Sequence, residues 1–208
     1  SWEAGNQQSQ DPNATSCPED VRGILTYPVI ENQYLERISP LGHVKADDRM
    51  HVIPISHIYY VNSKSAQVFS PADLWLESIE RLTQIDSSGN VIWGDFNIHM
   101  IPCKEIKIEF DHVRNLSDVF MQMLNESEEQ CSKDPPTANR RYETCRAEIK
   151  KKIKAGDTIG WAGGYGNFGL DVAAYDIRVK NPFISPERYR FPSFQGICFL
   201  DLYSGILK

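Results

Sequence analysis

Residues 155–178, AGDTIGWAGGYGNFGLDVAAYDIR, constrain the fold more than any other part of the chain. Gly156 and Asp157 are typical of a tight turn. Residues 158–161 and 170–177 are mostly apolar and favour strands, and the segment between them is rich in glycine. Glycine permits positive φ and a close approach of two backbones. The stretch therefore predicts two strands that are joined either by a close-packed turn or by a flexible hairpin loop.

Other segments also show strand patterns. Residues 57–61 are rich in β-branched and aromatic side chains, which favour a buried strand. Residues 104–113 alternate apolar with charged side chains, which favours a strand with one solvated face. Further strands are expected at residues 91–100, after the polar turn at residues 86–90, and at residues 196–203.

The period of the apolar residues changes after Asn115. Leu116, Val119, Phe120, Met123 and Leu124 fall at helical spacing. They predict a short amphipathic helix that Ser117 caps. A second helix is expected over residues 139–153, which are rich in charge and carry lysines near the end, where a helix dipole favours them. Together they predict a helical insertion at about residues 116–153.

The domain organisation follows from length and composition. Residues 1–20 are rich in Gln, Asn, Ser, Asp and Pro, which predicts a flexible leader. The remainder, residues 21–208, has the length of a single domain. Strands connected by hairpins and interrupted by one helical insertion predict a mostly-β fold, either a small sandwich or a barrel.

The charge and hydropathy patterns exclude two classes of partner. The net charge is −6 and no long basic run is present, which argues against nucleic acid as the main partner. No stretch approaches the roughly 20 apolar residues of a membrane span. We therefore expect no nucleic-acid partner and no membrane span.

Cysteines and glycosylation triplets indicate a secreted or cell-envelope protein. The 5 cysteines show no C-x-x-C spacing, which disfavours a zinc ribbon or a thioredoxin site. Cys131 and Cys145 bracket a polar segment and are predicted to form a local disulfide. The alternative is a cytosolic protein with reduced cysteines. The candidate N-glycosylation sites are Asn13, Asn115 and Asn125, each in an N-x-S/T triplet.

The motif AGDTIGWAGGYG, followed by a strand that ends in YDIR, resembles the C-terminal motif of the lysostaphin-like peptidoglycan endopeptidases. In these zinc enzymes a glycine-rich turn precedes a strand that carries His-x-His. Residues 67–79, QVFSPADLWLESI, are similar to another segment of the family. The resemblance covers roughly residues 50–185. It implies a two-layer hybrid β-barrel or sandwich, here with a short helical insertion.

The resemblance also implies the fate of the zinc site. His57 matches the first zinc ligand, and His112 matches a histidine that assists catalysis. Val172 and Ala174 match the two positions of His-x-His, and Val61 matches the position of an acidic ligand. None of these three side chains binds zinc or transfers a proton. We therefore expect a family scaffold whose normal zinc site is lost.

A smaller set of ligands is left. His57, His112 and Asp171 converge if their strands are arranged as in the family, and two imidazoles with a carboxylate form a legitimate metal set. His112 is the one candidate catalytic residue. The alternative is that both histidines are buried and hydrogen-bonded without any ligand.

Aromatic residues are expected around the cleft, where they suit stacking on sugars or holding a peptide, unless they only fill the core. They are Trp161, Tyr165, Phe168 and Tyr175. We therefore expect a non-catalytic secreted or cell-envelope protein without a cofactor, which binds a glycan, a peptide or other extracellular protein subunits. The alternative is a divergent metal-dependent hydrolase, with zinc as its cofactor, that acts on a peptide or peptidoglycan-like substrate through His57, His112 and Asp171.

Overall fold

Antiparallel strands make up most of the chain, and one short α-helix interrupts them. The computed structural model describes residues 15–44, 56–62, 64–134, 141–163, 169–183 and 193–205. The strands are β1 (Leu35–Ser39), β2 (Ile58–Asn62), β3 (Ala66–Phe69), β4 (Leu74–Ile85), β5 (Val91–Cys103), β6 (Ile106–Leu116), β7 (Glu129–Lys133), β8 (Arg141–Ile153), β9 (Thr158–Ala162), β10 (Leu170–Asp176) and β11 (Gly196–Ile197). The helices are α1 (Asp118–Asn125) and the 3-10 turns η1 (Asn32–Tyr34), η3 (Ser193–Gln195) and η4 (Phe199–Leu202).

All eleven strands belong to one sheet, whose main path runs β1-β2-β10-β6-β5-β4-β8-β7. Off this path, β11 pairs with β10, and β9 pairs with both β3 and β6. The two ends of the path, β1 and β7, do not pair with each other in the part of the chain that the structure describes. The predicted mostly-β class with a short helix is therefore confirmed, and the sheet is an open one that is not closed into a barrel.

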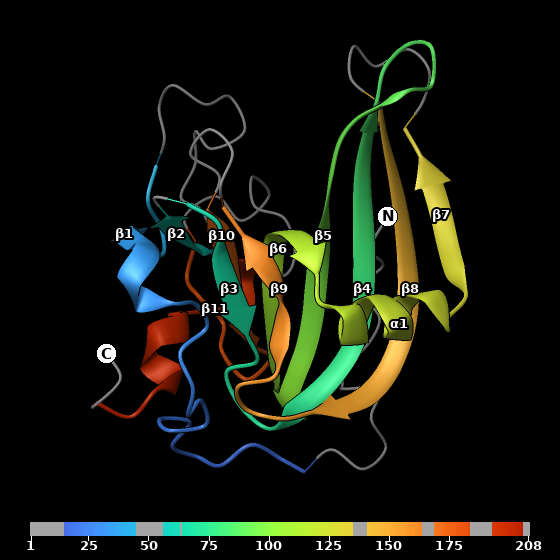
Figure 1. Cartoon of the computed structure of the whole chain (residues 1–208). Helices are drawn as coiled ribbons and strands as arrows, with labels where there is room; N and C mark the ends of the chain where they lie inside the picture. Colours follow the sequence, from blue (N-terminus) through green and yellow to red (C-terminus); the bar gives the residue numbers. More distant parts are fainter. Residues whose placement is uncertain are drawn as a thin grey trace.

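Strands β4, β5 and β8 form a tall ribbon that rises beyond the rest of the molecule (Figure 1). β4 pairs with β5 on one side and with β8 on the other over nearly its whole length. The predicted polar turn joins β4 to β5: Asp86 Oδ1 accepts hydrogen bonds from the backbone N–H groups of Ser88 and Asn90, both at 2.8 Å. This short connection fixes the register of the hairpin.

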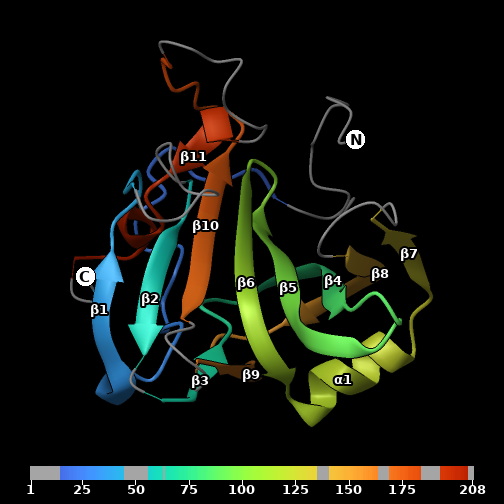
Figure 2. The same cartoon turned by 90° about the horizontal axis from the view of Figure 1, so that it is seen from above.

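Strand β6 lies at the centre of the sheet (Figure 2). One of its edges pairs with β5. Its other edge is shared by two strands in succession, because β10 pairs with residues 106–111 and β9 pairs with residues 113–116. Strands β9 and β10 therefore act as one interrupted strand along β6.

Alternation along β6 and β10 separates an apolar face from a polar face. Ile106, Ile108 and Phe110 of β6 are fully buried, and so are Val172 and Ala174 of β10. These side chains join one continuous core, into which β2, β3, β4, β5, β8 and β9 also contribute. The 3-10 turn η4 completes the core, since the ring of Phe199 packs edge-on against Phe110 at 6.1 Å between centroids.

Helix α1 confirms the first predicted helix. Ser117 caps it by accepting a hydrogen bond from the backbone N–H of Phe120 at 3.4 Å. Phe120 and Leu124 are its buried residues, and Val119 on the outer side is 59% exposed. The prediction of an amphipathic, capped helix after Asn115 is therefore correct.

The second predicted helix, over residues 139–153, is wrong. Residues 141–153 form strand β8, and within the described part of the insertion, residues 116–134 and 141–153, the helical segment is α1. The buried positions Cys145, Ala147 and Ile149 recur at every second residue, which is the period of a strand. The charged residues between them dominate the composition, which is typical of an exposed helix and conceals the alternation of the buried residues.

The predicted final strand at residues 196–203 is also mostly wrong. Gly196 and Ile197 pair with β10, the chain then turns through η4, and Tyr203 forms an isolated bridge with Leu25. A hydrogen bond from Tyr203 Oη to the carbonyl of Tyr27 at 2.9 Å ties this end of the domain to residues near its beginning. The contact between Tyr203 and Tyr27 therefore overrides the strand propensity of residues 198–203. Such a tertiary contact cannot be inferred from the local sequence.

Two disulfides connect distant parts of the fold. The predicted pair Cys131–Cys145 is confirmed and joins directly opposed residues of β7 and β8. A second disulfide links Cys17, within the predicted leader, to Cys103 at the end of β5. Cys198 is the free cysteine. Residues 1–14 of the predicted leader lie outside the described residues.

We expect the two disulfides to contribute unequally to stability. They close loops of 86 and 14 residues in sequence separation. Chain-entropy arguments then give losses of about 4–5 kcal/mol for Cys17→Ala with Cys103→Ala and about 3 kcal/mol for Cys131→Ala with Cys145→Ala. Urea unfolding of both double variants measures the two free energies of unfolding. A larger loss for the Cys131–Cys145 pair would contradict this order.

Candidate functional site

An interruption in β6 places His112 at the centre of the candidate site. His112 has a φ of 69°, in the left-handed region that residues other than glycine rarely adopt. It lies where the edge partner of β6 changes from β10 to β9. The alternation of the strand breaks there, since Asp111 and His112 are both half-buried between the buried Phe110 and Val113. The side chains of Asp111 and His112 therefore both lie on the polar side of the sheet.

Four side chains form a chain of alternating imidazole and carboxylate groups. His112 Nδ1 lies 2.6 Å from Asp95 Oδ2, and His112 Nε2 lies 3.6 Å from Asp171 Oδ2. The same Asp171 oxygen lies 3.1 Å from Nε2 of His57. The structure thus brings His57, His112 and Asp171 together, and it adds Asp95, which the sequence analysis did not identify.

The environment of His112 favours its charged form. Burial alone lowers its pKa, but the hydrogen bond with Asp95 and the charges of Asp171, Asp95 and Asp111 raise the pKa to about 9. His112 is therefore an imidazolium at neutral pH, and it keeps 31% of its side-chain surface exposed. Nδ1 is held by Asp95, whereas Nε2 lies 3.6 Å from Asp171, beyond hydrogen-bond distance, so the Nε2–H group is the donor left for a ligand. The imidazolium has no lone pair with which to accept a proton.

A second group of ionisable side chains continues along the same face of β6. Glu109 Oε1 lies 3.4 Å from His99 Nδ1. Burial raises the pKa of Asp111 to about 7, with further contributions from the charges of Glu109 and Asp171. Burial also raises the pKa of Tyr175, which interacts with Glu109 and Ser56. The polar face is thus a continuous, largely desolvated network.

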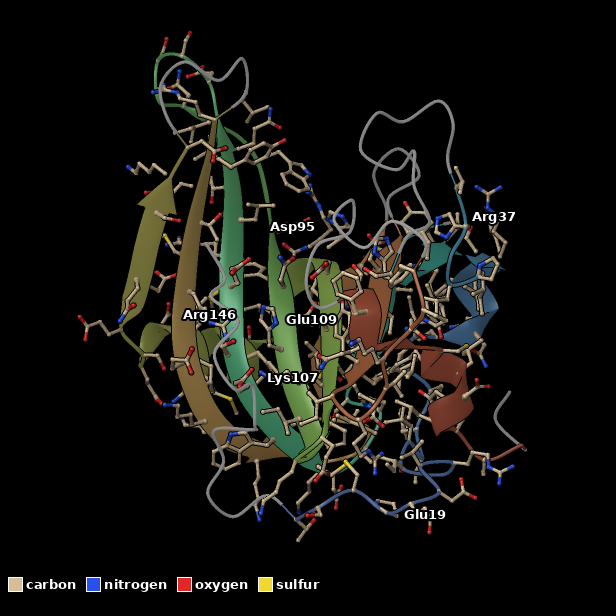
Figure 3. All side chains as sticks on the ribbon, turned by 180° about the vertical axis from the view of Figure 1, so that it is seen from behind. Glu19, Arg37, Asp95, Lys107, Glu109 and Arg146 are labelled. Atoms are coloured by element: carbon tan, nitrogen blue, oxygen red, sulfur yellow. A yellow bond between two sulfur atoms is a disulfide. The ribbon has the colours of Figure 1, made fainter. Side chains whose placement is uncertain are left out.

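Cationic side chains limit the charge at the other end of this network. Lys107 Nζ lies 3.5 Å from Glu77 Oε1, and Arg146 Nη2 lies 3.8 Å from Glu77 Oε2. Lys107 and Glu109 from β6 and Arg146 from β8 lie on the same side of the sheet (Figure 3). Toward β8, the carboxylates of this face are therefore neutralised by cationic side chains. Around Asp111 and Asp171, the carboxylates outnumber the cations.

The donor atoms of His57, His112 and Asp171 do not have the spacing of a zinc site. Zinc ligands lie at about 2.1 Å from the metal, so any two of them are at most about 4.2 Å apart. Among the described residues, donor atoms of three residues fall within 4.8 Å of one another only in two groups, Cys17–Cys103–Glu105 and Cys131–Glu143–Cys145. Each of these contains a disulfide, and neither includes the histidines. The predicted metal set therefore does not fit zinc as it is placed.

The residues at the matched His-x-His positions point away from the site. Val172 and Ala174 are 0% and 1% exposed and belong to the apolar core. Because side chains alternate along a strand, the residues of β10 that share the face of Asp171 are Ala173 and Tyr175. Val61, at the matched acidic position, is buried on β2. The side chains of Val172 and Ala174 therefore do not reach the histidines.

The aromatic residues predicted to surround a cleft do not share one opening. Trp161 pairs with Asn115, and Tyr175 pairs with Lys107. Eight residue steps of β6 separate these positions, roughly 25 Å of strand. Tyr175 is 6% exposed. Tyr165 and Phe168 lie outside the described residues.

Another aromatic residue lies beside His112. The ring of Trp93 is 6.1 Å from the His112 ring, and the Arg114 guanidinium lies 5.5 Å from the Trp93 ring. Arg114 also donates a hydrogen bond from Nη1 to the carbonyl of Gly94 at 3.1 Å. Sequence reasoning missed Asp95 and Trp93. The run WGDF, with an acid inside a strand, was the only signal of them, and no local pattern links it to His112.

The predicted localisation is partly supported, and the glycosylation sites stay predictions. Asn115 and Asn125 are exposed, as glycosylation requires, and Asn13 lies outside the described residues. Two disulfides indicate a protein of a non-cytoplasmic compartment. Among the described residues, no helix is long and apolar enough to cross a membrane.

Comparison of the chain with models of protein families, with curated proteins and with solved structures finds no match. The resemblance to lysostaphin-like endopeptidases therefore stays a prediction. The site has to be interpreted from its own geometry.

The charge state of His112 can be measured directly. We expect its ring protons to titrate with a midpoint near pH 9 by NMR, with the His112→Gln spectrum assigning the signal. Asp95→Asn removes the carboxylate that stabilises the imidazolium, so it lowers the pKa of His112 by about 1–3 units. Lys133→Gln, on β7 and 64% exposed, is the control. An unchanged midpoint in Asp95→Asn would show that Asp95 does not hold the charge.

Asp111 is expected to make stability depend on pH. Its pKa of about 7 in the folded protein lies well above the ordinary range of an aspartate, so its contribution to stability is present at low pH and is lost as the pH rises through 7. Asp111→Asn imitates the protonated acid. It should raise the free energy of unfolding at pH 8 by at least about 1 kcal/mol and change it little at pH 4.

Urea unfolding at pH 4, 6 and 8 tests this dependence. Glu36→Gln, an exposed carboxyl on β1, is the matched control and should behave as the unmodified protein does. An Asp111→Asn variant that is less stable at pH 8 would mean that the ionised carboxylate makes favourable contacts in the fold.

Proposed function

We propose that this chain is a non-catalytic binding protein, secreted or held in the cell envelope, that binds a glycan or a peptide at the His57–Asp171–His112–Asp95 site. One observation carries the proposal. A single oxygen of Asp171 lies within 3.1 Å of one imidazole and 3.6 Å of the other. The carboxylate therefore occupies the space between the two rings, where a shared metal ion would have to lie.

The charge of the site supports binding rather than catalysis. His112 is an imidazolium whose pKa is raised to about 9, so at neutral pH it is a poor general base. It is well suited to donate a hydrogen bond to a carbonyl or hydroxyl oxygen. Such oxygens are abundant in acetamido sugars and in peptide backbones, and a hydrogen bond from a charged donor is stronger than one between neutral groups.

The backbone at His112 supports a functional role for this residue. A non-glycine residue at positive φ costs on the order of 1–3 kcal/mol and persists where the surroundings determine it. Asp95 also keeps Oδ1 buried without a hydrogen-bond partner among the described residues, as does Asp171. Backbone strain and unpaired acceptors that occur together, as around His112, lower stability and are typical of a functional site.

The resemblance, taken as a hypothesis, leads to the same conclusion by a corrected alignment. The side chains of β10 that lie on the histidine side are Asp171 and Ala173. If these are the positions of His-x-His, one ligand is replaced by a carboxylate and the other by a methyl group. The family's metal set is then still incomplete, and the groups that remain suit recognition.

A zinc-dependent hydrolase remains the alternative, and one contact favours it. The Asp95–His112 distance of 2.6 Å is that of a carboxylate orienting an imidazole, an arrangement that recurs in hydrolytic sites and around metal ligands. For this function the rings of His57 and His112 would have to approach each other by a movement of Asp171.

One experiment separates the two functions. The purified protein is titrated calorimetrically with a soluble disaccharide–peptide fragment of peptidoglycan, and its zinc content is measured by elemental analysis. We expect binding without turnover and without stoichiometric zinc. His112→Gln should weaken binding by about 10- to 100-fold, the value of a charged hydrogen bond.

Lys133→Gln is the control for loss of a positive charge and should bind normally. Stoichiometric zinc that is lost in both His57→Gln and His112→Gln, together with hydrolysis of the fragment, would establish the hydrolase instead. Equal affinity of His112→Gln and the unmodified protein would remove this site from the binding function.

A further inference from the structure

A separate pocket lies at the far end of β10 from the histidine site. Its volume is about 350 Å³, at the lower end of the range for small-molecule sites. Residues from four segments line it: Leu41, Gly42, Ser56, Asn181, Phe183, Ser193 and Gly196. Asp171 lies at the beginning of β10, whereas Gly196 pairs with Tyr175 near its end. The pocket and the histidine site are therefore neighbours without shared lining residues.

The walls of the pocket are held in place by hydrogen bonds. Asn181 donates from Nδ2 to the carbonyl of Gly196 at 2.7 Å and from its backbone N–H to the carbonyl of Phe194 at 2.7 Å. The ring of Phe183 packs edge-on against Phe194 at 5.3 Å between centroids. These contacts join the segment after β10 to the segment that enters β11. The pocket is preformed, which reduces the entropic cost of binding.

The lining determines the chemistry of the ligand. Leu41 and Phe183 supply apolar surface, and Ser56, Ser193 and Asn181 supply hydroxyl and amide groups. Among the residues that the structure describes, none of those that line the pocket is charged. A charged ligand would lose its hydration without gaining a partner of opposite charge, which is costly. A neutral ring with one apolar face and several polar substituents satisfies both kinds of wall.

We propose that this pocket is a second binding site, for a small uncharged ring that carries hydroxyl or amide groups, the chemistry of a neutral sugar residue. The aromatic side chain of Phe183 and the aliphatic side chain of Leu41 contact the apolar face of the ring. Ser56, Ser193 and Asn181 bind its polar groups. This inference stands apart from the function proposed for the histidine site, because it uses none of that site's four residues.

The pocket also contacts the polar network of the sheet. Ser56 lies in the lining and interacts with the hydroxyl of Tyr175, which interacts with Glu109 in turn. Ser56 directly precedes His57. An occupant that forms a hydrogen bond with Ser56 is therefore in contact with the group of side chains that leads to the histidine site.

NMR titration of the whole chain tests the proposal, with N-acetylglucosamine as the neutral probe and glucuronate as the charged one. We expect saturable shifts at the amides of Gly42, Ser193 and Gly196 with N-acetylglucosamine. Glucuronate should bind at least about tenfold more weakly, since its carboxylate finds no cation among the described lining residues.

Matched variants identify the site. Leu41→Trp fills the pocket and should abolish the shifts, whereas Val44→Trp adds the same ring at a position that is 54% exposed and outside the lining. Ser193→Ala removes one hydroxyl without filling the pocket and should weaken binding severalfold, so the test does not depend on the folding of Leu41→Trp. His112→Gln should leave the shifts unchanged.

The outcomes separate this inference from the function of the histidine site. Absence of saturable shifts at the three amides in the unmodified protein would overturn the pocket proposal, whatever the histidine site binds. Persistence of the shifts in both Leu41→Trp and Ser193→Ala would do the same. Loss of the shifts only in His112→Gln would mean that the sugar binds at the histidine site.

Discussion

The sharing of one edge of β6 between β10 and β9 is the constraint on which the site depends. A regular strand would send Asp111 and His112 to opposite faces. The left-handed backbone at His112 interrupts the strand between its two partners and turns both side chains toward the polar side. Asp171, at the start of β10, and Asp95, on β5, then meet the two nitrogens of His112. The position of four functional side chains follows from one irregular residue.

The polar face shows how a sheet can bury charge without losing its fold. Its other face provides an apolar core of Ile, Val, Leu and Phe side chains, which supplies the driving force for folding. Carboxylates on the polar face are paired with histidine, lysine or arginine, as at Glu109 and Glu77. The pairing is incomplete around Asp111, whose pKa rises to about 7. The unfavourable electrostatic free energy of the polar face is thus concentrated beside His112. A ligand that compensates this charge would bind most favourably there.

The spacing of apolar residues predicts the secondary structure of this sequence better than its composition does. The turn at Asp86, the alternating strand that became β6 and the capped helix after Asn115 were predicted from period and turn residues, and they are confirmed. The strand β8 was mistaken for a helix because its many charges outweighed its alternation of buried residues. The convergence of His57, His112 and Asp171 came from the resemblance. Asp95 was missed because it meets His112 only through the pairing of β5 with β6, which no local pattern encodes.

The disulfide on β7 has a mechanical consequence for the whole sheet. β7 is the outermost strand, nearly all of its side chains are exposed, and Cys131 joins it to the directly opposed Cys145 of β8. Without this disulfide, thermal fraying of β7 would expose the backbone hydrogen-bonding groups of β8. A strand from another molecule could then pair with them. The cross-link makes peeling of the outer strand require the breaking of a bond. The disulfide thereby prevents strands of other molecules from pairing with the edge of the sheet and forming polymers.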